Sequence, residues 1–151
     1  MTIFFDVDGV LNTQSDWQYK YVVNSVCVGA FAELVQTLSK RVPVQLVICS
    51  TWRAGIGKCD ADSKQMQNLR AALQRYGLHI ADSTPISNKG RQAEIEYYIR
   101  RHEIQDYLVI DDDPSLFERP GDLILYTPNY RTGFTTQDVK TVLKLLKSHR
   151  R

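Results

Sequence analysis

The chain has 151 residues, of which 43% are hydrophobic and 24% charged, a size and composition that suit a single globular domain, residues 1–151, with a buried core. Its 19 lysines and arginines nearly balance 17 aspartates and glutamates, giving a formal net charge of +2. This balance excludes a protein coated throughout with positive charge for nucleic-acid binding, although a local basic patch stays open.

Patterns typical of strands and helices alternate along the chain. In chain order they are a strand at 2–7, a helix around 31–38, a strand at 44–50, a helix around 66–76, a short strand at 78–81, a helix around 95–102, strands at 107–111 and 123–126, and a helix from about Thr136. This alternation predicts an α/β fold with a parallel sheet covered on both faces. Two irregular segments, 12–29 and 51–62, follow strand ends, where ligands bind in such sheets.

Asp6 and Asp8 stand two residues apart at the end of the first strand. If strand geometry holds through Asp8, both carboxylates point to the same side of the sheet, and Gly9 then lets the chain turn. Carboxylates paired at the mouth of a sheet repel each other and are tolerated mainly beside a cation. The alternative is a loop with two solvated acids.

A second acidic cluster, Asp111, Asp112 and Asp113, ends the strand at 107–111. Two parallel strands then bring five carboxylates to one edge of the sheet. Mg²⁺, a hard cation that prefers oxygen ligands, is the natural counter-charge. Asp113 precedes Pro114 and is also explained as a turn opener.

Two weaker signals lie between these clusters. Ser50 and Thr51, where the strand at 44–50 ends, offer hydroxyl and backbone N–H groups to a phosphate oxygen, but such residues are also common helix caps. Lys89 stands before the helix around 95–102, where a lone lysine is more often a solvated surface residue.

Four segments in this order resemble the motifs of the haloacid dehalogenase (HAD) superfamily of phosphohydrolases. They are FFDVDGVLN at 4–12, ICSTWR at 48–53, SNKG at 87–90 and VIDDD at 109–113. Within the superfamily, they are most similar to the HAD domains of Swiss Army Knife RNA-repair proteins. The resemblance implies a three-layer, Rossmann-like parallel sheet and a phosphatase active site.

The resemblance assigns specific roles to the acidic residues. Asp6 would attack phosphorus to form a phospho-aspartate, and Asp8 would serve as general acid and then as general base. Mg²⁺ would be held by Asp6, by the main-chain carbonyl of Asp8, by Asp112 and, directly or through water, by Asp111.

The resemblance also implies a set of phosphate-binding residues. Ser50 would donate a hydrogen bond to a phosphoryl oxygen, with Thr51 as the alternative, and Lys89 would reach the same oxygens while balancing the carboxylates. Arg53 suits a second phosphate, and Trp52 suits a nucleotide. The competing interpretation makes Trp52 a core residue and Arg53 a salt-bridge partner for an acid of the fourth motif.

Many members of the superfamily carry a cap domain, for which this chain has little room. We expect a capless enzyme with at most a short flap at 12–29, and an open site of this kind suits a phosphorylated macromolecule. A nucleic-acid end is the leading substrate, ahead of a phosphoprotein or a nucleotide. In the flap, Trp17, Tyr19 and Tyr21 are suited to base stacking or to packing on the sheet.

Cysteine usage and the absence of targeting signals bear on the compartment. Cys27, Cys49 and Cys59 are an odd number with no C-x-x-C spacing, which predicts reduced thiols, and Cys49 fits a core position. The first apolar run contains acids, unlike a secretory signal, and no apolar run is long enough for a membrane span. We therefore expect a soluble cytoplasmic protein. A catalytically weak phosphate-binding or regulatory module that acts through a protein partner is the competing functional hypothesis.

Overall fold

The computed structural model describes residues 1–57 and 62–150, so Cys59 lies outside the described residues. Its sheet has five strands in the order β3-β2-β1-β4-β5, and every neighbouring pair is parallel. The strands are β1 Thr2–Phe5, β2 Gln45–Ile48, β3 Ile80–Ser83, β4 Tyr107–Ile110 and β5 Leu125–Tyr126. The predicted α/β class is confirmed.

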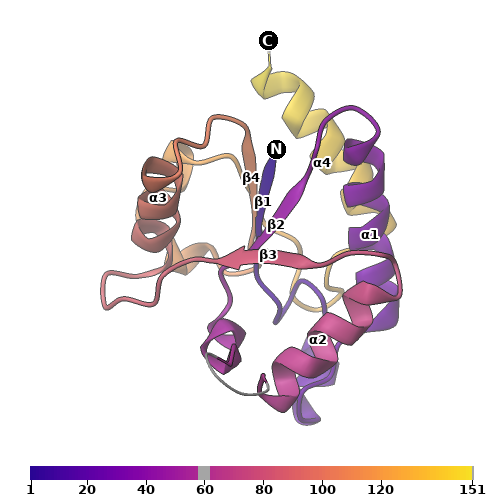
Figure 1. The fold of residues 1–151 in the computed structure, drawn as a ribbon. Helices are drawn as coiled ribbons and strands as arrows, with labels where there is room; N and C mark the ends of the chain where they lie inside the picture. The colour runs from indigo at the N-terminus through magenta and orange to yellow at the C-terminus, as the bar shows by residue number, and fades with distance from the viewer. Residues whose placement is uncertain (58–61, 151) are drawn as a thin grey trace.

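Helices cover both faces of the sheet, which gives three layers (Figure 1). They are α1 Ser25–Ser39, α2 Lys64–Gln74, α3 Arg91–Arg101 and α4 Thr136–His149. Side chains alternate between the two faces of each strand, so Ile3 and Phe5 pack into the core with α1, α2 and α4, while Phe4 packs with α3. Among the described residues, no helix is both long enough and apolar enough to cross a bilayer.

Several element boundaries differ from the predicted ones. Strand β3 begins two residues later than expected, and β5 has only two residues. Helix α1 begins at Ser25 rather than near Ala30, because the Asn24 side chain caps it by accepting bonds from Val26 N and Cys27 N. The first two residues of the helix, Ser25 and Val26, are exposed and interrupt the apolar pattern. The segment before α1 is therefore shorter than predicted and contains a 3₁₀ helix, Gln14–Gln18.

The order of the strands in the sheet determines where the polar residues that follow them lie. The chain runs from β1 through β2 to β3 on one side and then crosses to β4 on the other, so the order reverses beside β1. Ligands bind at such a point in open α/β sheets. Phe5 is in register with both Ile48 and Ile110, and therefore the residues that follow β1, β2 and β4 emerge at one edge.

Candidate active site

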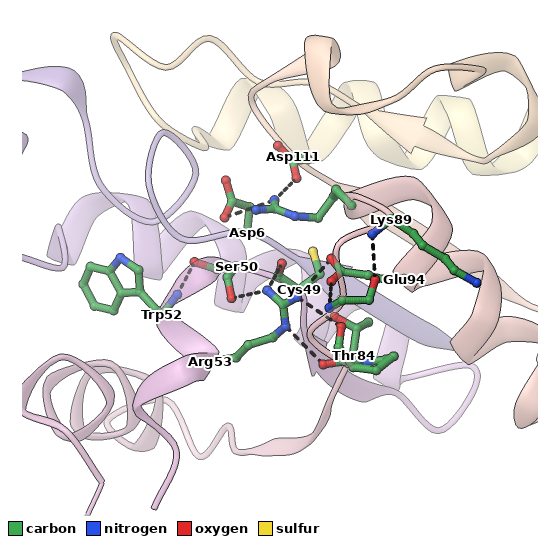
Figure 2. Close-up of polar contacts among 12 residues, drawn as sticks. Asp6, Cys49, Ser50, Trp52, Arg53, Thr84, Lys89, Glu94 and Asp111 are labelled. Atoms are coloured by element: carbon green, nitrogen blue, oxygen red, sulfur yellow. Dashed lines mark hydrogen bonds and ion pairs between the residues drawn. The ribbon is translucent and has the colours of Figure 1, made fainter.

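Three carboxylates meet where β1 and β4 end. Asp6, Asp111 and Asp112 each offer a carboxylate oxygen, and these atoms all lie within 4.8 Å of one another. Asp6 and Asp111 are buried, and Asp112 is half-buried. Figure 2 shows Asp6 and Asp111 close together. The two acidic motifs converge because parallel strands deliver their carboxyl ends to the same edge.

The charge of this cluster is only partly compensated. Arg91 donates a hydrogen bond to Asp111, and its Nη1 lies 3.5 Å from Asp6 Oδ1. Burial, reinforced by a hydrogen bond with Asp112 and opposed by the Arg91 guanidinium, raises the pKa of Asp6 to about 7. Burial and the nearby Asp6 also raise the pKa of Asp111 to about 7, again opposed by Arg91. One guanidinium cannot neutralise three carboxylates, so the site favours a further cation.

The arrangement of these oxygens fits Mg²⁺. This ion prefers carboxylate oxygens in octahedral geometry at about 2.1 Å, and the cluster offers it three carboxylates on neighbouring strand ends. Asp6, Asp111 and Asp112 would hold the ion and leave positions for water and a phosphate oxygen. The Asp8 carboxylate is not part of the cluster, so a role for Asp8 as ligand rests on its main-chain carbonyl, as the resemblance implied.

Gly9 is required by the close approach of the chain to this cluster. Its φ of +78° lies in the left-handed region, and a Cβ atom built there would lie 2.2 Å from Asp112 Oδ2. Any side chain at this position would displace a candidate metal ligand in addition to straining the backbone. Gly9 therefore lets the turn after Asp8 pass beneath Asp112.

Asp8 lies outside the cluster and has a hydrogen-bond network of its own. Asn12 Nδ2 donates to Asp8 Oδ1 at 2.9 Å, and Trp52 Nε1 donates to Asp8 Oδ2 at 3.2 Å. Asn12 is itself fixed, since its Oδ1 accepts from Gly9 N at 3.0 Å and from Trp17 Nε1 at 2.9 Å. Both carboxylate oxygens of Asp8 are thus held in one orientation by donors.

Ser50 and Thr51 occupy different environments after β2. Ser50 is 1% exposed, and its Oγ accepts from Trp52 N at 3.1 Å, which caps the 3₁₀ helix Thr51–Gly55. Thr51 is exposed and lines a cavity of about 240 Å³ together with Arg91. The choice between the two as phosphate ligand stays a prediction.

Arg53 is a structural residue and has little freedom to bind substrate. Its guanidinium donates to the carbonyls of Cys49, Ser50, Thr84 and Pro85, and it pairs with Glu94 Oε1 at 3.0 Å. Figure 2 shows these contacts joining the end of β2 to α3. The structure therefore argues against the predicted substrate-binding role of Arg53. The salt-bridge alternative has the wrong partner, since Glu94 belongs to α3 and not to the fourth motif.

Trp52 is a core residue that also contacts a candidate catalytic group. It is 5% exposed and packs in the core cluster that contains Phe5, as the core interpretation predicts. Its indole N–H nevertheless reaches Asp8, so the same side chain fixes a candidate catalytic group. Asp113 caps the 3₁₀ helix Pro114–Leu116, in agreement with the turn-opener explanation, and Cys49 is a fully buried core residue.

The positions of Lys89 and Arg91 relative to the carboxylate cluster differ from what the sequence predicted. The Lys89 side chain is exposed and points away from Asp6 (Figure 2), whereas Arg91, the first residue of α3, contacts both Asp6 and Asp111. No motif in the sequence pointed to Arg91, because the turn at Gly90, with φ +98°, determines which residue faces the sheet. Asn12 is the last residue of the first motif, but the sequence did not predict its contact with Asp8.

A Rossmann-like sheet with an aspartate pair after β1 and an acidic cluster after β4 defines a HAD-like protein. A model of the HAD domain in Swiss Army Knife RNA repair proteins matches residues 2–139, and the chain belongs to this family. The search of curated proteins found no match. Family membership, together with the aspartate cluster, supports phosphohydrolase chemistry.

Proposed function

We propose that this protein is a Mg²⁺-dependent phosphomonoester hydrolase that acts through a phospho-aspartate on Asp6. The observation that carries the proposal is the cluster that Asp6 forms with Asp111 and Asp112. Two residues further along the chain, Asp8 has both carboxylate oxygens oriented by Asn12 and Trp52. In the proposed mechanism the cluster supplies a cation site for the nucleophile, and Asp8 supplies the acid–base group.

In the first step, an Asp6 carboxylate oxygen forms a bond to phosphorus and the ester P–O bond breaks. Asp8, protonated at this stage, transfers its proton to the departing oxygen, so that the leaving group is released as an alcohol. Bound Mg²⁺ supplies positive charge that lowers the repulsion between the Asp6 carboxylate and the phosphate.

In the second step, Asp8 is a carboxylate and accepts a proton from water. The water oxygen bonds to phosphorus, and the bond between phosphorus and the Asp6 oxygen breaks. Inorganic phosphate is released, and Asp6 and protonated Asp8 are regenerated for another turnover. The donors from Asn12 and Trp52 keep Asp8 pointing toward the same place in both steps.

Arg91 is the residue that we assign to charge balance in the cluster, because it contacts both Asp6 and Asp111. The resemblance implied this role for Lys89, whose ammonium lies away from Asp6 in the structure. Ser50 or Thr51 would donate to a phosphoryl oxygen. Lys89, at the N-terminal end of α3, is left with a role in attracting the phosphate toward the site.

The proposed substrate is the phosphorylated end of a nucleic acid. The support is the family description, which places related domains in RNA repair proteins, and the short segment between β1 and α1, which suits the open site that we expect. A phosphoprotein and a free nucleotide are the competing substrates.

The first test is hydrolysis of para-nitrophenyl phosphate with and without Mg²⁺, for the wild type and Asp6→Asn. We expect turnover that requires Mg²⁺, is abolished by chelation and is lost in the variant. Activity that survives chelation, or an Asp6→Asn rate equal to that of the wild type, would contradict the mechanism. Trapping of a phosphorylated protein at Asp6 in a rapid quench would support the covalent step directly.

A further inference from the structure

A pocket of about 380 Å³ opens on the Asp8 side of the site. This volume falls within the roughly 300–1,000 Å³ that is typical of small-molecule sites. Asp8 and Trp52 form part of its wall. In the proposed reaction Asp8 protonates the leaving oxygen, so whatever is bonded to that oxygen must extend into this pocket.

The outer wall of the pocket consists of exposed aromatic side chains. Trp17, Tyr19 and Tyr21 line it and are 44%, 63% and 39% exposed. Exposure of this extent contradicts the alternative that these residues pack on the sheet. Aromatic side chains grouped around a cavity offer flat surfaces on which a nucleobase stacks.

This wall is held in place by hydrogen bonds and stacking. Asp16 Oδ2 accepts from Thr13 N at 2.8 Å and from Asn24 Nδ2 at 3.1 Å. These bonds join the 3₁₀ helix Gln14–Gln18 to the residue before it and to the residue that caps α1. Asn68 of α2 donates to the Tyr21 carbonyl at 3.1 Å. Trp17 stacks on Tyr130 with ring centroids 6.0 Å apart. The pocket is therefore formed before any ligand enters it, which lowers the entropic cost of binding.

The polar residues of the pocket can contact both the base and the backbone of a nucleotide. Gln18 and Gln65 line it, and their amides can pair with the edge of a base because each has both donors and an acceptor. Lys20 lines the same pocket and is exposed, which suits the phosphodiester that follows a terminal nucleoside.

We infer that this pocket is the leaving-group subsite and binds the terminal nucleoside of a phosphorylated strand, with its base against Tyr19 and Trp17. The inference rests on the proposed function, because Asp8 defines the leaving-group side. The sugar hydroxyl that carried the phosphate would then face Asp8, and the rest of the nucleic acid would extend past Lys20.

The test uses the ratio of kcat/KM for a dinucleotide with a terminal phosphate to kcat/KM for acetyl phosphate, which has no base. Both 3′- and 5′-phosphorylated dinucleotides are measured, and the better substrate is used. Tyr19→Ala removes one stacking surface, and the ratio should fall about tenfold. Tyr97→Ala, a matched change of an exposed tyrosine on α3, should leave the ratio at its wild-type value.

An unchanged ratio in Tyr19→Ala, or an equal fall in Tyr97→Ala, would overturn the inference. A selective loss of phosphopeptide turnover in Tyr19→Ala would also overturn it, in favour of a protein substrate. Binding is measured separately by quenching of tryptophan fluorescence with a nucleoside monophosphate in the Asp6→Asn variant. If the wild type hydrolyses no phosphoester but this quenching occurs and is weakened by Tyr19→Ala, the proposed function fails while the nucleoside subsite is supported.

Discussion

Two buried arginines lie at the carboxyl edge of the sheet, Arg53 beside β2 and β3 and Arg91 beside β1 and β4. Arg53 pairs with Glu94, and backbone carbonyls accept the other bonds of its guanidinium. Arg91 instead faces a cluster of three carboxylates. The first arrangement is balanced in charge, and the second has an excess of negative charge.

This difference in charge balance distinguishes an arginine that stabilises the fold from one that lies in a candidate binding site. A buried pair whose hydrogen bonds are all made holds elements together and offers a ligand little. In the second arrangement burial, together with the neighbouring acids, raises the pKa of Asp6 and Asp111, and such a cluster gains most from a bound cation. We therefore expect changes beside Arg91 to alter activity and changes beside Arg53 to alter stability.

The largest expected effect is on turnover in Asp6→Asn. Removal of the nucleophile should lower kcat by at least about 10³-fold, because the amide of asparagine cannot form the phospho-aspartate. Steady-state hydrolysis measures the rate, and circular dichroism checks that the fold is retained. Asp122→Asn, a change of an exposed acid that pairs with Arg119, is the control and should keep wild-type activity.

Arg53→Met tests the balanced side of the comparison. The change leaves Glu94 buried without its ion-pair partner and the carbonyls that Arg53 serves without their donor, so the free energy of unfolding should fall by about 3–5 kcal/mol. Urea denaturation measures this loss. The double variant Arg53→Met/Glu94→Gln should recover part of it. A loss of activity at unchanged stability would show that Arg53 acts on substrate after all.

The sequence was sufficient for the sheet and for the two acidic motifs. Apolar runs that end in Asp6 and Asp111 mark buried strands, and parallel pairing alone brings their carboxyl ends together. It was insufficient for Arg53, in the 3₁₀ helix after β2, and for Arg91, the first residue of α3, because the backbone direction after a strand or a turn determines which side chain points inward. Charge balance is a property of three-dimensional neighbours, and nothing in the order of residues distinguished Arg91 from the nearby Lys89.

Arg91→Gln and Lys89→Gln form a direct test of that choice. Arg91→Gln should lower kcat/KM by roughly 10²-fold, the scale expected when a charged group that orients a catalytic site is removed, because Arg91 contacts both Asp6 and Asp111. The loss in Lys89→Gln should be at least tenfold smaller. Turnover of para-nitrophenyl phosphate measures both. The reverse order would return the charge-balancing role to Lys89, as the family resemblance implied.

The smallest expected effect is the stabilisation of the fold by Mg²⁺. Because binding to the folded state alone stabilises it, Mg²⁺ at about 100 times its dissociation constant should add about 2.7 kcal/mol and raise the Tm by roughly 5–10 °C. Asp112→Asn should lose most of this shift, since it removes one of the three clustered carboxylates. Asp113→Asn is the matched control, because Asp113 caps a 3₁₀ helix and asparagine serves equally well as a cap. A shift lost equally in both variants would place the cation outside the cluster of Asp6, Asp111 and Asp112, and the negative excess beside Arg91 would then need another explanation.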